Sequence, residues 1–275
     1  MDQSQIDSQT LYDTALQLAQ KAGNAIVQQR HQLDIQFKQG TELVTQADVA
    51  ADQIIRDGIL AHFPDHQILS EELAPDNPTD CEHLWVIDPI DGTVNYAHLH
   101  PQVAISIAYY HQGKAQVAVV HNPFLNETFS AVNGRGAWLN QLPIQCATTQ
   151  DMRRALIATG FPYDKHDIPQ LIQRLQAVLT QCADIRRLGS AALDICWVAC
   201  GRLDAYYETV KPWDFAAAQL IAREAGVQFG HIHALPEGVN PQLCGENIIL
   251  AVPALFSPLQ QLLQQADMLF ASEKR

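Results

Sequence analysis

The nine residues W-V-I-D-P-I-D-G-T at positions 85–93 constrain the fold more than any other stretch of this chain. Residues 84–87 are apolar and rich in β-favouring side chains, so they predict a short buried strand. Asp88 and Pro89 come next in the chain. Because proline has no backbone N–H and a fixed φ, we expect the strand to end at Asp88.

The second half of this stretch has the residues of a sharp turn, Asp91 followed by Gly92. The turn would bring Asp88 and Asp91 to the open end of the buried strand, beside the hydroxyl of Thr93. Two interpretations are open on these residues alone. One is a plain turn, and the other is a site for a hard cation, with backbone amides near enough to hold a phosphate.

The composition limits the classes of protein and partner. The chain has 275 residues, of which 47% are hydrophobic, enough for one large domain or two fused halves. A net charge of −13 argues against nucleic acid or an anionic membrane as a direct partner. No apolar run approaches the ~20 residues of a membrane span, and the polar N-terminus is unlike a signal peptide. Six cysteines without a C-x-x-C pair indicate reduced thiols and a cytoplasmic protein.

Periodic apolar residues predict a mixed α/β (α+β) chain. The expected helices cover about residues 8–30, 45–63, 171–179, 190–200, 213–224 and 253–270. The expected strands cover about residues 33–37, 67–69, 84–87, 103–110, 116–121, 128–132, 137–139, 155–159, 184–188, 202–208 and 248–252. Four of these, from residue 103 to residue 139, read as an antiparallel meander. The periodicity lapses near residues 141–151, so we expect an N-terminal half over 1–145 and a C-terminal half over 146–275 that closes the site within one compact unit.

Three further acids stand at the ends of predicted elements. Glu71 follows a strand, Asp48 is the last residue of a capping box, and Asp214 lies in the first turn of a helix. Each acid also has a plainer interpretation. Glu71 can be a solvated surface acid, Asp48 a helix cap only, and Asp214 a favourable charge at a helix N-terminus. If the strands at 67–69 and 84–87 are neighbours, the loops at their carboxyl ends converge.

Convergence of Glu71, Asp88, Asp91 and Asp214 would create a pocket with a charge of about −4, which cations would have to offset. Carboxylate ligands suit Mg²⁺, Mn²⁺ or Ca²⁺ rather than Zn²⁺. The histidine pairs at 98/100 and 231/233 could suggest zinc, but each lacks a third ligand nearby in the sequence. Two hard cations can orient a water and stabilise a leaving oxygen, which fits hydrolysis of a phosphate ester.

Two long motifs now carry a resemblance. W-V-I-D-P-I-D-G-T-V-N-Y at 85–96 resembles the first signature of the inositol monophosphatase family, and P-W-D-F-A-A-A-Q-L-I-A-R-E-A-G at 212–226 resembles the second. The segments at 43–48, 70–72 and 186–192 follow the family's order. The resemblance implies a layered α/β/α/β/α sandwich, a homodimer, and a phosphatase that depends on Mg²⁺ and is sensitive to Li⁺.

The resemblance also implies roles for individual residues. The metal ligands would be Glu71, Asp88, the Ile90 carbonyl, Asp91 and Asp214. They would hold two or three Mg²⁺ ions, with Mn²⁺ as a substitute. The catalytic residues would be Glu71, Asp48 and Thr93, the last two orienting the attacking water. The substrate contacts would be Asp91, Gly92, Thr93, Arg186, Gly189, Ser190, Ala191 and Glu208.

The expected reaction is hydrolysis of inositol-1-phosphate to inositol and phosphate. Members of the same superfamily act instead on fructose-1,6-bisphosphate, histidinol phosphate or nucleotide phosphates, and these stay open as alternatives. A different class of function is also open. Some bacterial relatives associate with the transcription machinery independently of catalysis, and an acidic chain is able to bind a basic protein partner.

Overall fold

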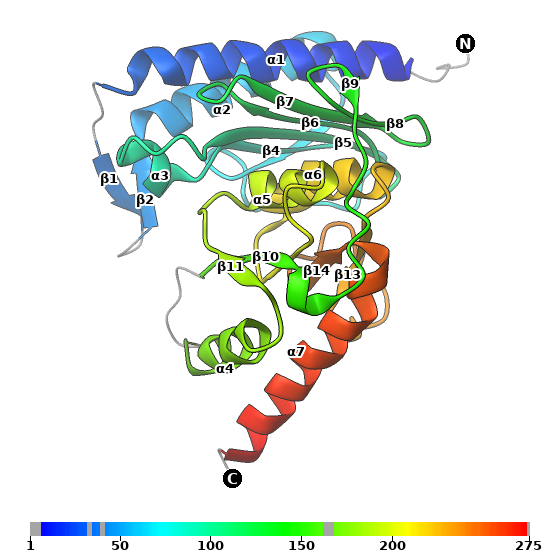
Figure 1. Ribbon diagram of the computed structural model, residues 1–275. Coiled ribbons are helices and arrows are strands. Elements are labelled where there is room, and N and C mark those ends of the chain that lie inside the picture. Colours follow the sequence, from blue (N-terminus) through cyan, green and yellow to red (C-terminus); the bar gives the residue numbers. More distant parts are fainter. Residues whose placement is uncertain (1–6, 32–34, 39–41, 162–167, 274–275) are drawn as a thin grey trace.

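Helices and β-sheets alternate in five layers in the computed structural model, which describes residues 7–31, 35–38, 42–161 and 168–273 (Figure 1). Helices α1 and α2 cover the outer face of a seven-stranded sheet, and α5 and α6 lie between that sheet and a five-stranded sheet. Helix α7 packs on the far side of the smaller sheet, with α4 beside it. This arrangement confirms the predicted α/β/α/β/α sandwich.

Six of the seven described α-helices begin and end close to the positions predicted from periodicity, and α3 was not predicted. They are α1 (Ser8–Gln29), α2 (Gln46–His62), α3 (Thr93–Ala97), α4 (Ile168–Leu179), α5 (Ala191–Ala199), α6 (Pro212–Glu224) and α7 (Pro253–Glu273). A short 3₁₀ turn covers Met152–Arg154. Helix α2 opens with the predicted capping box of Thr45 and Asp48, and Ser190 caps α5.

The seven-stranded sheet has the strand order β3-β4-β5-β6-β7-β8-β9. Its strands are β3 (Gln67–Ser70), β4 (His83–Asp91), β5 (Ala104–His111), β6 (Lys114–Asn122), β7 (Glu127–Val132), β8 (Gly136–Leu139) and β9 (Leu142–Pro143). Strands β3 and β4 are parallel, and the remaining neighbours are antiparallel, which confirms the meander. The parallel pair sends the ends of β3 and β4 to the same edge of the sheet.

The five-stranded sheet has the order β11-β10-β12-β14-β13. Its strands are β10 (Leu156–Thr159), β11 (Asp184–Arg186), β12 (Ala205–Glu208), β13 (Gln228–His231) and β14 (Ile248–Ala251). The sequence analysis placed no strand at β13, because its four residues, Q-F-G-H, do not alternate in polarity. A separate two-stranded ribbon pairs β1 (Ile35–Lys38) with β2 (Glu42–Thr45). Residues 33 and 34 of the predicted first strand lie outside the described residues.

The expected end of β4 at Asp88 is wrong. The strand continues through Pro89 to Asp91, and its register with β5 shifts between Asp88 and Asp91. A β-bulge of this kind leaves one residue outside the ladder, so the missing N–H of proline is tolerated there. The bulge re-aims both carboxylates while the strand remains part of the sheet.

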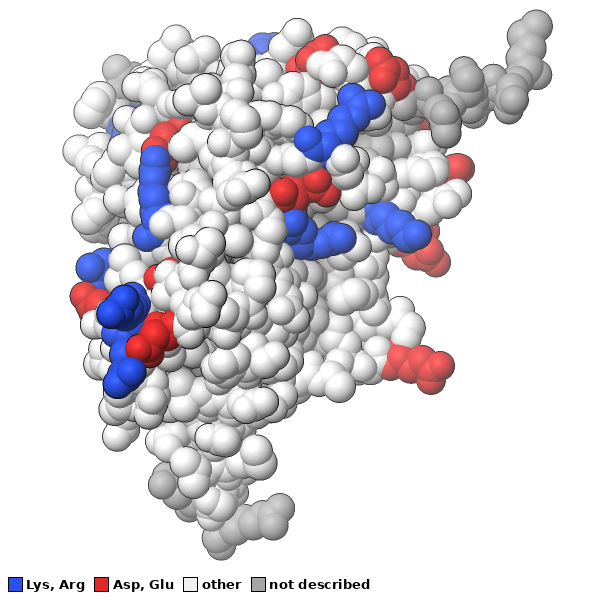
Figure 2. All heavy atoms as spheres, turned by 45° about the vertical axis from the view of Figure 1, so that its right-hand side comes forward, with Lys and Arg blue, Asp and Glu red and all other residues white. Residues whose placement is uncertain are grey.

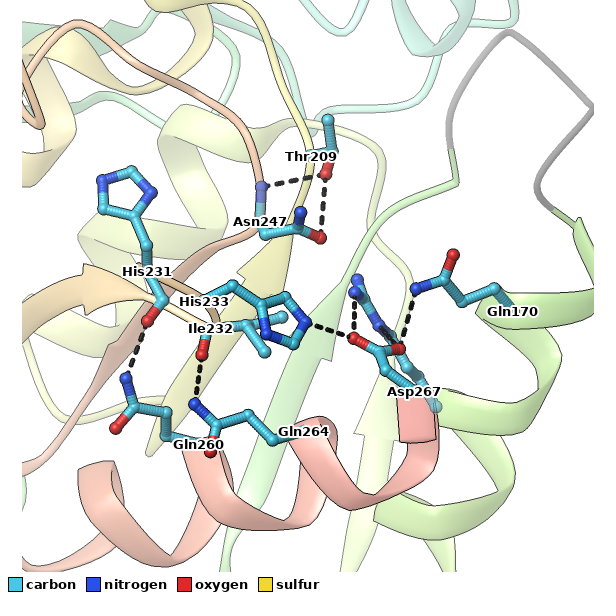
Figure 3. A network of polar contacts seen from close by, with 10 residues as sticks. Gln170, Thr209, His231, Ile232, His233, Asn247, Gln260, Gln264 and Asp267 are labelled. Atoms are coloured by element: carbon cyan, nitrogen blue, oxygen red, sulfur yellow. Dashed lines mark hydrogen bonds and ion pairs between the residues drawn. The ribbon is translucent and has the colours of Figure 1, made fainter. Parts of the chain in front are cut away.

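Apolar side chains fill the spaces between the layers. One core lies between α1, α2 and the large sheet, a second surrounds α5 and α6, and a third lies under α7. Side-chain amides fix α7 to the end of β13, because Gln260 and Gln264 donate to the carbonyls of His231 and Ile232 at 2.7 and 2.5 Å (Figure 3). No described helix is long and apolar enough to cross a membrane.

Candidate active site

The bulge in β4 buries two carboxylates at the edge where β3 and β4 end. Asp88 is 1% exposed and Asp91 is 8% exposed. The amide of Ile90 donates to Asp88 Oδ1 at 3.0 Å, which fixes the first carboxylate against the backbone of the bulge. This arrangement places both acids inside the protein, next to the short helix α3.

The carboxylate of Asp91 accepts hydrogen bonds from the first turn of α5. Ser190 Oγ and the amide of Ala192 donate to Oδ2 at 2.6 and 2.7 Å. The amide of Ala191 donates to Oδ1 at 3.3 Å. Helix N-termini carry free N–H groups and favour a nearby negative charge. The structure therefore joins the D-P-I-D-G-T stretch to the predicted substrate segment at 189–191.

Gly92 and Gly189 lie where these two segments meet. Gly92 has φ of 96°, and a Cβ there would lie 2.8 Å from the carbonyl oxygen of Gln102 and 3.1 Å from that of Gly189. Only glycine combines this backbone conformation with so close an approach. Asn95 ties the same segments together by donating to the carbonyls of Gln102 and Leu188 at 2.9 and 2.7 Å.

Asp214, which lies in the second signature motif at 212–226, contributes a third carboxylate. Asp214 lies in the first turn of α6, where its Oδ2 accepts the amide of Lys211 at 2.7 Å. One oxygen from each of Asp88, Asp91 and Asp214 lies within 4.8 Å of the other two. Asp214 is thus both a helix cap and a member of the acidic cluster, so its two interpretations are compatible.

Burial and mutual repulsion make these carboxylates hard to ionise. Burial, then the charges of Glu71, Asp91 and Asp214, raises the pKa of Asp88 well above its usual range. The pKa of Asp214 is raised well above its usual range by burial and then by the charge of Asp91. Burial raises the pKa of Asp91 to about 6, although the hydrogen bonds from the start of α5 oppose this shift. The effect on Asp88 also places Glu71 beside the cluster.

Asp48 and Thr93 form a buried pair next to the cluster. Thr93 Oγ1 lies 3.0 Å from Asp48 Oδ1 and 3.1 Å from the carbonyl oxygen of Ile90. The other oxygen of Asp48 accepts the amide and the hydroxyl of Thr45 at 2.8 and 2.5 Å. The carboxylate of Asp48 therefore caps α2 with one oxygen and holds Thr93 with the other.

Glu208 closes another side of the site, at the end of β12. Tyr206 donates to its Oε2 at 2.5 Å, and a Cβ on Gly160 would lie 1.9 Å from the same oxygen. Burial raises the pKa of Glu208 to about 7, while Tyr206 and the charge of Arg187 oppose this shift. The described site thus has a carboxyl group that titrates near neutral pH.

The two neighbouring arginines have different surroundings. Arg186 Nη1 forms an ion pair with Asp184 Oδ2 at 2.5 Å, on the exposed edge of the smaller sheet. The charge of Arg187 instead opposes the rise that burial causes in the pKa of Asp91 and of Glu208. Its guanidinium lies 5.4 Å from the ring centre of Phe161. The substrate role of Arg186 stays a prediction, and Arg187 is the arginine whose charge acts on the carboxylates.

Two further charged residues near the site, Arg187 and Asp194, were not predicted from the sequence. Asp194 is 1% exposed in α5, and its Oδ1 has no hydrogen-bond partner among the described residues. Burial and then the charges of Asp91 and Glu208 raise its pKa well above the usual range. The signal in the sequence was an acid within the apolar run A-A-L-D-I-C-W-V-A, directly after the Gly189-Ser190 cap.

The two histidine pairs that could have suggested zinc differ in their surroundings. Both ring nitrogens of His231 face backbone carbonyls, those of Glu246 and Pro241, at 2.8 and 3.2 Å. His233 Nε2 lies 2.7 Å from Asp267 Oδ2 (Figure 3). His98 and His100 are exposed. Neither pair belongs to a metal-ligand cluster in the described part of the chain.

Comparisons with known proteins give a consistent result. The sequence model of the inositol monophosphatase family matches residues 7–263. Nus factor SuhB from Escherichia coli (strain K12) is 40% identical over 248 residues, which cover 88% of this chain and 91% of that protein. The structure of inositol monophosphatase from Anabaena (Nostoc) sp. PCC 7120 is similar with a TM-score of 0.84 and 34% identity, over 94% of this chain and 97% of that one. Extragenic suppressor protein suhB from Bartonella henselae gives a TM-score of 0.85 and 32% identity, over 92% and 98% of the two chains.

Proposed function

Because this chain belongs to the inositol monophosphatase family, we propose that it is a Mg²⁺-dependent phosphatase of small phosphate monoesters, with inositol-1-phosphate as the first substrate to test. The observation that carries the proposal is the meeting of Asp88, Asp91 and Asp214, with their carboxylate oxygens within 4.8 Å of one another. Two elements far apart in the sequence, β4 and α6, supply these acids. Their burial is unfavourable for the charged forms, as their raised pKa values indicate.

The chemistry of the donor set fits Mg²⁺. The cluster offers carboxylate oxygens, and the carbonyl of Ile90 lies at its edge, next to Thr93. Hard cations prefer such oxygen ligands. Glu71, Asp88, Ile90, Asp91 and Asp214 would hold the ions. When bound, the ions would offset the charge of the phosphate, polarise its oxygens and make a nearby water more acidic.

The chain's own residues would position the reacting groups. With its proton directed to Asp48, the Thr93 hydroxyl would present a lone pair to the attacking water, and Glu71 would help to hold that water. The backbone amides of Gly92 and Thr93 are the proposed phosphate donors. Such fixed donors stabilise negative charge without having to reorganise during the reaction.

The substrate's alcohol portion would lie between the start of α5 and the end of β12. The contacts that the family resemblance gives are Arg186, Gly189, Ser190, Ala191 and Glu208. Of the two adjacent arginines, we expect Arg187 to contribute more, because its charge acts on Asp91 and Glu208. A carboxyl such as Glu208 can accept hydrogen bonds from hydroxyl groups when it is ionised. Several adjacent hydroxyls on the substrate, as in inositol, would suit this side of the site.

A substrate panel tests the proposal. Initial rates of phosphate release should be measured at equal Mg²⁺ for inositol-1-phosphate, fructose-1,6-bisphosphate, histidinol phosphate and a nucleotide bisphosphate. We expect Mg²⁺-dependent release, fastest from inositol-1-phosphate, and loss of that release in Asp91→Asn. No turnover of any phosphate monoester by the wild type, or full turnover by Asp91→Asn, would refute it.

Two further proposed properties have their own tests. Addition of Li⁺ to the same assay tests the proposed sensitivity to Li⁺. Light scattering tests the proposed homodimer.

A second proposed function is binding to the transcription machinery. The name Nus factor SuhB, carried by a relative 40% identical to this chain, favours it. The net charge of −13 makes a basic protein a better partner than RNA. Acidic and basic side chains are interspersed on the face in Figure 2, which suits a polar protein contact. Capture of a purified transcription component by both the wild type and Asp88→Asn would support a role independent of catalysis.

A further inference from the structure

Three metal-ligating side chains meet far from the acidic cluster, where β4 begins and β5 ends. One ligand atom from each of Glu82, His83 and His111 lies within 4.8 Å of the other two. We propose that these residues bind a divalent transition-metal ion, with Zn²⁺ as the expected occupant, through one imidazole nitrogen from each histidine and a carboxylate oxygen of Glu82. This site is independent of the proposed phosphatase activity.

The backbone of the sheet places the three ligands. His83 lies directly opposite His111 in the antiparallel pairing of β4 and β5, and the ring centres are 5.1 Å apart. Residues opposite each other in such a pair project from the same face of the sheet. The amide of Gln112 donates to the carbonyl of Glu82 at 2.8 Å, which fixes the third ligand across from the end of β5. His83 and His111 lie on paired strands, and ligands held on strands keep their positions better than ligands on free loops.

Tyr109 supplies the partner that a metal-binding histidine usually has. Its hydroxyl lies 2.6 Å from Nδ1 of His83 and is buried with the ring. It can accept the Nδ1–H of His83, which leaves the lone pair of Nε2 free for a metal. This second contact fixes the orientation of the His83 ring.

A further histidine supports the ring of His83 without competing for the metal. His66 stacks on His83 with ring centres 4.5 Å apart, and its Nδ1 accepts the indole N–H of Trp85 at 3.0 Å. Because Nδ1 of His66 accepts that hydrogen bond, the proton of the neutral ring lies on Nε2, and the ring has no free lone pair for the metal.

The ligands of this site favour a different metal ion from the one expected at the acidic cluster. Imidazole nitrogens suit Zn²⁺ and its neighbours, whereas Mg²⁺ prefers oxygen ligands alone. Bonds of about 2.0–2.1 Å to a tetrahedral ion bring ligand atoms roughly 3.3 Å apart, so the exposed side chain of Glu82 would rotate inward. Glu82 also lines a surface hollow of about 1080 Å³, which gives ions a path to the site. The five residue-to-residue steps along β4 from His83 to Asp88 span roughly 17 Å, which separates the two sites.

The test is a Zn²⁺ titration by calorimetry on untagged full-length protein, with saturating Mg²⁺ present so that the acidic cluster is occupied. We expect one Zn²⁺ per chain in the wild type, and binding at least tenfold weaker in His111→Gln and in Glu82→Gln. Both substitutions are at accessible positions, so the fold should persist. The controls are His98→Gln, an exposed histidine outside the cluster, and Cys81→Ser, which removes the adjacent thiol.

Both controls should bind Zn²⁺ like the wild type. Neither Cys81 nor His98 belongs to the described cluster whose ligand atoms lie within 4.8 Å of one another. Titration with Co²⁺ provides an independent readout, because nitrogen and oxygen ligands in a tetrahedral site give visible absorption bands that His111→Gln should lose. Absence of Zn²⁺ binding by the wild type, or equal affinity in His111→Gln, would overturn the proposal. Loss of binding in Cys81→Ser but not in His111→Gln would do the same.

Discussion

Ser190 Oγ donates a hydrogen bond of 2.6 Å to Asp91 Oδ2, joining two segments that are 99 positions apart. The same hydroxyl accepts the amide of Leu193 at 3.3 Å and so caps α5. One side chain therefore fixes both the start of a helix and the orientation of a carboxylate in the acidic cluster. Hydrogen bonds to the ionised form of a carboxyl lower its pKa, so this contact helps to keep Asp91 charged.

Replacement of this serine should move the acidic limb of the activity profile. In Ser190→Ala, Asp91 loses the donor that favours its ionised form, so its pKa should rise further above about 6. Metal ligands must be deprotonated, and activity should therefore begin to fall at a higher pH than in the wild type. The loss of the cap should also cost roughly 1 kcal/mol of stability. Rates measured across a pH series with Mg²⁺, together with urea unfolding, provide both readouts.

A buried serine elsewhere provides the matched control for Ser190→Ala. Ser130 is 3% exposed, and its Oγ lies 3.2 Å from the hydroxyl of Tyr12, on the other side of the large sheet. Ser130→Ala should lose stability without any shift of the pH profile. An unchanged profile in Ser190→Ala would contradict the assigned effect of its hydroxyl on Asp91.

Mg²⁺ should stabilise the protein more near pH 7.5 than near pH 5. The folded-state pKa values of Asp88, Asp91 and Asp214 lie above the ordinary value of 3.8, so the fold binds their protons more tightly than the unfolded chain does. The resulting cost is absent below about pH 4 and grows as the pH rises through about 6 for Asp91. Cations offset this cost only where the carboxylates are charged.

The measurement for this prediction is the rise in Tm on adding Mg²⁺ instead of EDTA, at each of the two pH values and at constant ionic strength. Acids elsewhere in the chain titrate equally with Mg²⁺ and with EDTA, so their effect on Tm cancels in the rise measured at each pH. Asp91→Asn should reduce the difference between the rises, since it removes one of the titrating ligands. Equal rises at both pH values in the wild type would show that the carboxylates are not the groups that Mg²⁺ meets.

Local patterns were enough to predict much of this fold and site. The helix over 8–30, the capping box at Asp48 and the meander all follow from residue spacing and turn chemistry, and the structure confirms them. The continuation of β4 through Pro89 could not be predicted from local patterns. It depends on the pairing of Asp91 with Ala104 of β5 beyond the bulge, which is a contact between distant residues. Contacts that depend on strand register, such as His83 opposite His111, were missed for the same reason.

The two arginines before Gly189 should differ in their effect on substrate binding. Arg187 acts on the charges of Asp91 and Glu208, whereas Arg186 is offset by its ion pair with Asp184. Arg187→Ala should therefore raise KM for a phosphate monoester by roughly tenfold, about the effect of losing one charge-assisted contact. Arg186→Ala should change KM by less. A larger rise in KM for Arg186→Ala would instead favour the role that the family resemblance gave to that residue.

The Thr93 hydroxyl should be needed for turnover more than for folding. It lies 3.0 Å from Asp48 Oδ1, and the proposed mechanism has it orient the attacking water. Thr93→Val keeps the shape of the side chain and should lower kcat by roughly 10²–10⁴-fold, the usual range for a group that handles a proton. Thr93→Ser keeps the hydroxyl and should stay within about tenfold of the wild type. A kcat for Thr93→Val close to that of Thr93→Ser would exclude this role for the hydroxyl.

Gly92→Ala should destabilise the protein more than the same change at Gly134. Both glycines have positive φ, 96° and 74°, so alanine would be strained at either position by about 1–2 kcal/mol. At Gly134 the new methyl group would meet nothing within 4 Å, whereas at Gly92 it would lie 2.8 Å from the carbonyl oxygen of Gln102. Overpacking of that kind adds roughly 1–3 kcal/mol. Urea unfolding of both variants measures the difference in stability. Equal losses of stability would mean that the backbone around Gly92 can shift to relieve the contact without destabilising the fold.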